Sequence, residues 1–185
     1  MKKIVIITGF ILSCFQLNAQ MNSPRIQEIL KIVKAQKPIP RSIFLDQQDL
    51  PDLKLSYESN TRNVWVLKDR DKVAPEQVFD IRLQFKSRKK AMAFHQEYLK
   101  ENSESGLLIT EPKFSVKKVA DFKVYRGVQQ EKMMEAMGLK GFTAYCFLMV
   151  VKNYFVKVYV SCKVKYDYKQ LEPLLKKIAQ RIKDQ

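Results

Sequence analysis

The sequence predicts an α+β domain built on a single, mainly antiparallel sheet of five to seven strands. Two runs rich in Val, Tyr and Phe, 142–151 and 154–162, flank the polar pair Lys152-Asn153, which is the pattern of a β-hairpin. A second pair of strand-like runs lies at 63–67 and 77–85. A segment with helical spacing follows each pair, so the order strand, strand, helix occurs twice.

The second run of the hairpin alternates between two kinds of side chain. Its valines and Cys162 share one parity, whereas aromatic residues and lysines share the other. Because successive side chains of a strand point to opposite faces, we expect the valine row to face the core. We also expect the helices 88–102 and 168–183 to pack together on that one face and cover it.

The remaining elements follow from shorter patterns. Ser87 is a suitable N-cap for the helix 88–102, and three further runs are strand-like, at 53–57, 107–110 and 122–126. An extra N-terminal helix is expected to begin at Ser23-Pro24 and to end before Pro38, so that 20–60 forms a helix and an irregular lead-in. Segment 127–138, which is rich in Met, is predicted to be a short helical connector that plugs the edge of the core or acts as a lid.

The N-terminus has the layout of a secretory signal peptide. Lys2 and Lys3 precede the apolar run 4–12, and a small residue at Ala19 suits cleavage. We therefore expect residues 1–19 to be removed and a single domain, 20–185, to reach the periplasm or the extracellular medium. Ile11-Leu12-Ser13-Cys14 supports an alternative, in which Cys14 is lipidated and the protein is an envelope-tethered lipoprotein.

The net charge favours anionic partners. Removal of Lys2 and Lys3 would lower the formal net charge from +15 to +13. Such an excess favours phosphate, acidic polysaccharide, membrane head groups or nucleic acid as partners, although it also serves solubility alone. Export argues against intracellular nucleic acid, and contact with a membrane is expected only through a lipid on Cys14.

The cysteines Cys146 and Cys162 would remain after cleavage. With a two-residue turn at Lys152-Asn153, Cys146 lies opposite Tyr159 and Cys162 opposite Thr143, so the thiols point to opposite faces. A three-residue turn would instead place the thiols on the same face, in a diagonal arrangement. Neither register brings the Cβ atoms to disulfide distance, and we expect two buried free thiols.

No residue set has the spacing of a catalytic or metal centre. His95 is the single histidine and lies within a predicted helix, which favours a structural role over that of a catalytic base. The acids near 69–80 are interleaved with Lys and Arg, as on a solvated turn. We expect no metal ion, no cofactor and no enzymatic activity; a hydrolase that uses His95 or a cysteine is the weakest alternative.

The residues that face away from the valine row form the candidate binding site. Lysines and aromatic rings along a strand suit an anionic or planar ligand through charge and cation–π contact, although they also suit a solvated outer face. The predicted row is Phe155, Lys157, Tyr159, Lys163 and Lys165, continued on a neighbouring strand by Lys123 and Tyr125. The sequence therefore favours an exported, non-catalytic binding protein for an anionic ligand or an envelope protein, with the Cys14-tethered structural lipoprotein as the alternative.

Overall fold

A computed structural model describes residues 31–68, 75–104, 108–110, 121–126, 135, 141–163 and 167–185. The chain divides into two compact units, Met1–Lys37 and Pro38–Gln185. In the first unit residues 31–34 are helical, and the Ala35 amide donates to the Lys31 carbonyl at 2.9 Å. This agrees with the predicted N-terminal helix, whose start at Ser23 lies outside the described residues.

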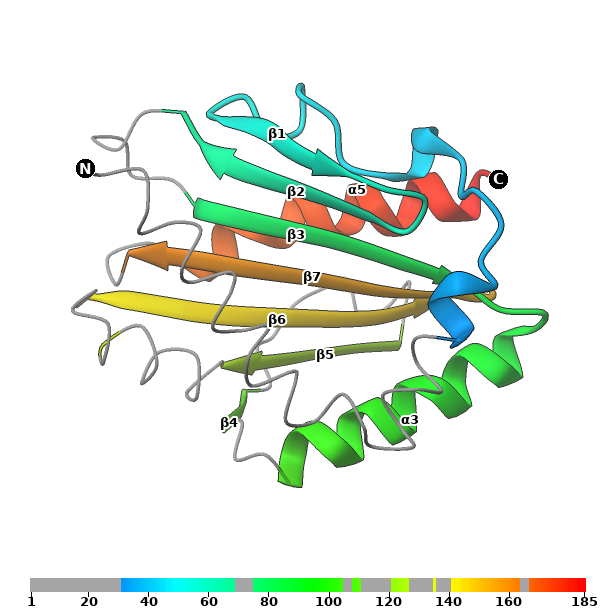
Figure 1. Cartoon of the computed structure of the whole chain (residues 1–185). Helices are drawn as coiled ribbons and strands as arrows, with labels where there is room; N and C mark the ends of the chain where they lie inside the picture. The colour runs from blue at the N-terminus through cyan, green and yellow to red at the C-terminus, as the bar shows by residue number, and fades with distance from the viewer. Residues whose placement is uncertain are drawn as a thin grey trace. The chain divides into compact units, whose positions relative to one another are not determined.

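The second unit is built on one seven-stranded antiparallel sheet, as the sequence predicted (Figure 1). The strand order is β1-β2-β3-β7-β6-β5-β4, which places the last strand of the chain at the centre. The strands are β1 (Leu53–Glu58), β2 (Arg62–Leu67), β3 (Pro75–Gln84), β4 (Leu108–Thr110), β5 (Asp121–Arg126), β6 (Phe142–Val151) and β7 (Tyr154–Lys163).

The hairpin of β6 and β7 has the predicted register. Lys152 adopts a φ of 51°, the left-handed conformation that tight two-residue turns require. Cys146 pairs with Tyr159 and Cys162 with Thr143, and both thiols are free and buried. The prediction of two buried free thiols is confirmed, and of the two registers considered the structure has the one with the thiols on opposite faces.

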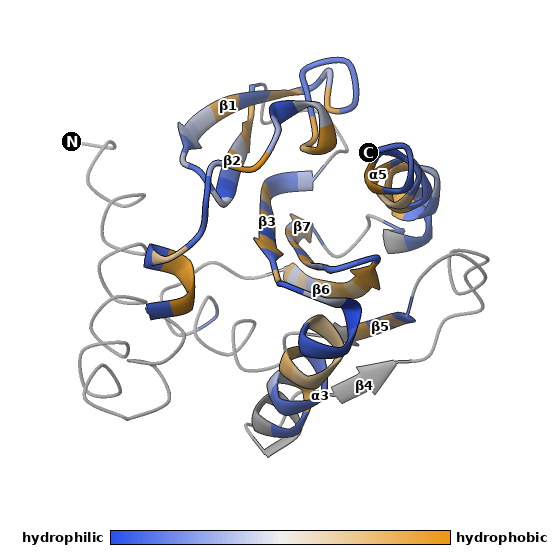
Figure 2. Ribbon diagram, turned by 90° about the vertical axis from the view of Figure 1, so that its right-hand side faces the viewer, coloured by the Kyte–Doolittle hydropathy of each residue, from blue (hydrophilic) through white to orange (hydrophobic). Residues whose placement is uncertain are grey.

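The two long helices lie on opposite faces of the sheet, so the prediction that both cover one face is wrong (Figure 2). The C-terminal helix α5 (Glu172–Lys183), which follows the 3-10 turn η3 (Tyr168–Leu171), buries its Leu and Ile side chains in one core with the valine row of β7. Helix α3 (Arg88–Glu104) covers the other row: the Phe94 ring lies 5.0 Å from that of Phe155. Hereafter we call these the α5 face and the α3 face.

The apolar character of β6 explains this arrangement. Phe147 and Met149 are buried on the α5 face, and Leu148 and Val150 are equally buried on the α3 face. A strand that is apolar on both parities must be covered on both sides to remove its side chains from water. One helix on each face satisfies this requirement.

The lead-in to the sheet completes the α5 face. Segment 38–52 contains a 3-10 turn, η1 (Arg41–Ile43), where the sequence indicated only irregular structure. Its apolar side chains join the same core as α5 and the valine row: Ile39, Ile43, Phe44, Leu45 and Leu50. This face is therefore closed by two segments from opposite ends of the domain.

Candidate functional site

The predicted basic and aromatic row is covered at one end. Phe155 is 2% exposed beneath Phe94, and Lys157 donates from Nζ to the Tyr98 hydroxyl at 2.7 Å while lying 5.2 Å from the centre of that ring. The aromatic side chains of α3 account for this burial, because they pack on the row as on any apolar surface. Phe155 and Lys157 consequently belong to the interface between the helix and the sheet.

The rest of the row is split among different surroundings. Tyr159 is half-buried against Phe79 with ring centres 5.6 Å apart, and Lys163 is exposed with Nζ 3.6 Å from the Glu76 carboxylate. Tyr125 lies in β5 opposite Cys146, but its side chain, like Lys165 and Cys14, is outside the described residues. The prediction of a continuous binding row is therefore not met by the residues that can be placed.

Lys123 leads to a different candidate site, a cavity between α3 and β5. The cavity has a volume of about 360 Å³, at the lower end of the range for small-molecule sites. Its lining comes from one stripe of the helix and three consecutive residues of the strand: Met92, His95, Gln96, Leu99, Asp121, Phe122 and Lys123. Residues four and seven positions apart share a helix face, which explains why Met92, Gln96 and Leu99 line it together.

His95 is the most deeply placed polar group of this cavity. The residue is 3% exposed, and its Nε2 atom has no hydrogen-bond partner among the residues that the structure describes. Burial lowers the pKa of His95 below its ordinary value, although the negative charge of Asp121 acts in the opposite direction. The ring is therefore neutral at neutral pH, and its Nε2 atom is buried without a hydrogen bond to the described part of the chain.

The charged groups at the cavity come from β5 and from the start of α3. The Asp121 carboxylate forms an ion pair with Arg88 at 2.5 Å, and Lys123 contributes a half-buried ammonium group. The first turn of α3 holds no acid but the exposed residues Arg88, Lys89 and Lys90, although acids suit a helix N-terminus better. The lining itself therefore carries one negative and one positive side chain, Asp121 and Lys123, and Arg88 pairs with Asp121 from outside it.

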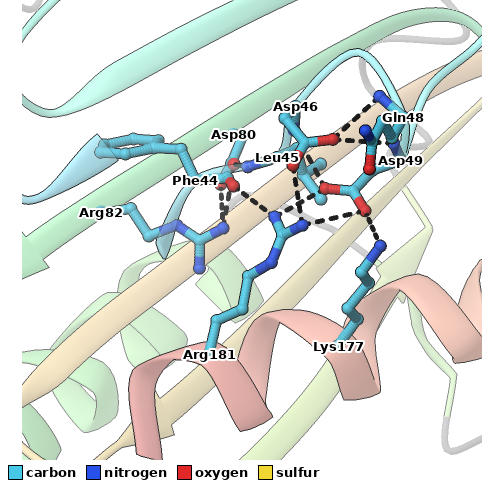
Figure 3. Close-up of polar contacts among 9 residues, drawn as sticks. All are labelled: Phe44, Leu45, Asp46, Gln48, Asp49, Asp80, Arg82, Lys177 and Arg181. Carbon is cyan, nitrogen blue, oxygen red and sulfur yellow. Dashed lines mark hydrogen bonds and ion pairs between the residues drawn. The ribbon is translucent and has the colours of Figure 1, made fainter. Parts of the chain in front are cut away.

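A second polar cluster lies on the α5 face, where the sequence indicated a solvated turn (Figure 3). Asp80 and Arg82 form an ion pair at 2.8 Å, and both side chains are fully buried. The Asp80 carboxylate also accepts the amide of Leu45 at 2.8 Å, and the Arg82 guanidinium lies 5.5 Å from the centre of the Phe44 ring. The expectation of solvated acids near 69–80 is therefore wrong for Asp80, because its charge is compensated inside the protein.

The remainder of this cluster fastens α5 to segment 38–52. Figure 3 shows Arg181 and Lys177 extending from α5 toward the carboxylates of Asp46 and Asp49. Arg181 contacts the buried Asp49 carboxylate at 2.6 Å and that of Asp46 at 2.8 Å, and it also donates to the Phe44 carbonyl at 2.6 Å. Lys177 forms a further ion pair with Asp49. These contacts join the two ends of the domain, and we interpret them as structural.

The Asp46 carboxylate is held by backbone hydrogen bonds as well as by Arg181. Burial alone would raise the pKa of Asp46, but the amide of Asp49 and the positive charge of Arg181 outweigh it and hold the pKa below its ordinary value. The amides of Gln48 and Asp49 donate to this carboxylate at 2.9 and 3.0 Å, and the Asp49 side chain accepts the Asp46 amide in return. Each of these two carboxylates thus accepts a hydrogen bond from the backbone amide of the other residue.

Neither region has the composition of a metal or nucleophile centre. In the described ranges no three His, Cys, Asp or Glu residues are grouped so as to hold a metal ion, and no helix is long and apolar enough to cross a membrane. Burial raises the pKa of the Cys146 thiol, although the positive charge of Lys157 opposes this, so the thiol stays protonated and unreactive at neutral pH.

Comparison with protein families, with curated proteins and with solved structures finds no match to this chain. The function therefore has to be argued from the residues described above. Among them, the residues that line the cavity between α3 and β5 include two charged side chains, Asp121 and Lys123, and the buried His95.

Proposed function

We propose that this chain is an exported, non-catalytic binding protein that holds a small ligand in the cavity between α3 and β5. The observation that carries the proposal is the buried His95 ring, whose Nε2 has no partner in the described part of the chain although it belongs to a cavity-lining residue. An unsatisfied buried polar atom costs about 1–3 kcal/mol. Trp65 Nε1 and Arg82 Nη1 on the α5 face also lack a hydrogen-bond partner in the described residues, so the cavity beside His95 is what distinguishes this position and supports the proposal.

The polar groups of the cavity suit binding better than a reaction. Among the described residues the Nε2 atom of His95 has no hydrogen-bond partner that could orient it, and the Asp121 carboxylate is engaged by Arg88. A general base needs both a partner that orients it and a reacting group within reach. We therefore propose recognition without chemistry.

The test uses the fact that His95 is the single histidine. Its imidazole protons give one set of resonances in a proton NMR spectrum, and these report directly on the cavity. We expect a library of small polar fragments to contain compounds that shift the His95 signals in a saturable way. His95→Leu should abolish binding of those compounds, measured on the ligand signals by saturation-transfer NMR because the variant has no imidazole. A library in which no compound shifts these signals would refute the proposed function.

Export has a separate test. Expression of the whole chain in a Gram-negative host, followed by N-terminal sequencing of the product, is expected to give Gln20 as the first residue of a protein in the periplasm or medium. A lipid-modified product that begins at Cys14 would instead support the envelope-tethered lipoprotein, and Cys14→Ser would then release it from the membrane fraction.

A further inference from the structure

We infer that one end of the sheet is a docking surface for an anionic membrane, which it contacts through charge. This inference goes beyond the cavity between α3 and β5 and does not depend on it. It follows from a compact group of exposed lysines and from the order of charges along α3. We call this group the basic end; its members are Lys86, Lys89, Lys90 and Lys152.

The basic end joins two segments that are far apart in the sequence. The Phe85 amide donates to the Asn153 carbonyl at 2.9 Å, and the side-chain amide of Asn153 donates to the Phe85 carbonyl at 2.6 Å. These bonds hold the turn between β6 and β7 beside the residues that lead from β3 into α3, and Figure 1 shows both at the same end of the sheet. Lys152 therefore lies next to the run 86–90, in which every residue is exposed.

The charges of the basic end are not compensated by the described part of the chain. None of its four lysines forms an ion pair with a described residue. Asp121 pairs with Arg88, so these two side chains together add no net charge. The first turn of α3 holds no acid. Several positive charges are consequently left facing water on a small surface, which attracts anions.

The order of charges along α3 reduces the stability of the helix. The N-terminus of a helix favours acids and its C-terminus favours bases, because the helix dipole is positive at the first turn and negative at the last. In α3 the first turn holds Arg88, Lys89 and Lys90 without an acid, and the last turn holds no base. Lysines that serve solubility alone could lie elsewhere without this cost. An external anionic surface explains their position, because it would compensate them.

The shape of the basic end fits a plane better than a linear polymer. A linear polyanion is bound along a track of positive side chains, but the exposed residues farther along α3 include Gln96 and Glu97. Lysines grouped at one end can instead approach the head groups of a membrane together. The run 86–90 holds no apolar residue to insert among lipid chains, so the contact is electrostatic. Where the sequence predicts membrane contact only through a lipid on Cys14, the basic end needs no such anchor.

Sedimentation with lipid vesicles tests the inference. The protein is mixed with vesicles of phosphatidylcholine, either pure or containing phosphatidylglycerol. We expect it to bind the acidic vesicles about tenfold or more tightly than the neutral ones. It should be released as the salt concentration rises from about 0.1 M to about 1 M, because the screening length falls from about 10 Å to about 3 Å. An apolar leader or a lipid on Cys14 would bind both kinds of vesicle, so neither produces this difference.

A double variant tests the location. One lysine near an acidic membrane contributes about fivefold in affinity, so Lys89→Gln with Lys90→Gln should bind the acidic vesicles roughly 25-fold more weakly. Lys54→Gln with Lys169→Gln is the matched control, because it removes two exposed lysines at the other end of the sheet. Lys169 follows the end of β7 and Lys152 precedes its start, about 30 Å away at about 3.4 Å per residue. The control should weaken binding by less than about threefold.

The outcomes decide this inference separately from the cavity. Equal binding to both kinds of vesicle, or equal weakening in the two double variants, would show that the basic end is not a membrane surface. Retention on immobilised heparin that depends on Lys89 and Lys90, without binding to vesicles, would show that it recognises a linear acidic polysaccharide, and the inference would be wrong. The vesicle comparison on the unmodified protein decides the question even if a variant does not fold. None of these measurements uses the His95 signals, so a negative result here leaves the proposed function standing.

Discussion

The two faces of the central strands bury polar groups in different ways. On the α5 face, the carboxylate of Asp49 meets Arg181 and Lys177, and that of Asp80 meets Arg82 and a backbone amide. On the α3 face, His95 is buried beside a cavity, and its Nε2 atom has no hydrogen-bond partner among the residues that can be placed. Polar groups that compensate one another stabilise a fold, whereas one without a partner reduces its stability. The α5 face also keeps atoms without a hydrogen-bond partner in the described residues, namely Trp65 Nε1, Asp80 Oδ1 and two nitrogens of Arg82. The difference between the faces is therefore that the buried charges of the α5 face are paired, whereas the cavity lies on the α3 face.

The largest loss of stability is expected when the Asp80 carboxylate is removed. Asp80→Ala leaves the fully buried Arg82 without its counter-charge and the Leu45 amide without its acceptor, and we expect a loss of about 3–5 kcal/mol in the free energy of unfolding. Urea unfolding followed by the fluorescence of Trp65, the single tryptophan, measures it. The double variant Asp80→Leu with Arg82→Met should recover most of the loss. A loss below about 1 kcal/mol in Asp80→Ala would contradict the account of this pair.

Truncating one apolar side chain on each face tests whether the two faces are packed equally tightly. Ile178→Ala removes a fully buried side chain from the core of the α5 face and should cost about 2–5 kcal/mol. Leu99→Ala shortens a half-buried side chain that already borders a cavity, so the expected cost is below about 1 kcal/mol. Thermal unfolding of both variants measures the difference. Equal costs would mean that the α3 face is packed as tightly as the α5 face.

The contact between α5 and segment 38–52 should depend on one carboxylate. Asp49→Asn removes the negative charge that Arg181 and Lys177 share, and we expect a loss of about 1–3 kcal/mol. Asp184→Asn, at the exposed end of the same helix, is the control and should stay within about 0.5 kcal/mol of the unmodified protein. Hydrogen exchange of the amides in 38–50 should accelerate in Asp49→Asn alone. Unchanged exchange would show that apolar packing holds this segment without the ion pairs.

The smallest expected change is a gain in the free energy of unfolding, in contrast to the losses predicted above. His95→Leu removes a buried polar atom that lacks a partner in the described structure, and it should stabilise the protein by about 1 kcal/mol at pH 7.5. Because burial keeps the pKa of His95 in the folded state below its ordinary value, the unfolded chain binds more protons as the pH falls below about 6.5. The unmodified protein should then lose stability that His95→Leu keeps, and the gap between their melting temperatures should widen from pH 7.5 to pH 5.5. A variant less stable than the unmodified protein at pH 7.5 would contradict the description of His95 as unsatisfied.

Local patterns were enough to predict the strands and the register of the hairpin. Side chains alternate along a strand with a period of two, and the turn at Lys152-Asn153 fixes the pairing of Cys146 with Tyr159. The face on which each helix packs was not predictable in this way, because the α3 face combines lysines with aromatic rings. Such a row is equally typical of a solvated surface and of one that an aromatic helix stripe covers.

The prediction that Asp80 of β3 is solvated was wrong for a related reason. Asp80 and Arg82 share a parity with Val78, and a strand with two charged residues on one face usually turns that face to water. Here Asp80 and Arg82 neutralise each other inside the protein. An argument from the alternation of polar and apolar residues does not detect such a pair. The cavity likewise could not be predicted from the sequence. His95 was placed correctly on a helix, but its distance from β5 depends on how that helix lies on the sheet.

The position of β7 has a consequence for the order in which this protein folds. It is the last strand to be synthesised, yet it lies at the centre of the sheet, between β3 and β6. Until residues 154–163 are available, the first three strands and the strands β4 to β6 each have an open edge where β7 belongs. The contacts that join the two halves are therefore distant in sequence and form late, so the chain remains without a complete sheet until its C-terminal part is released.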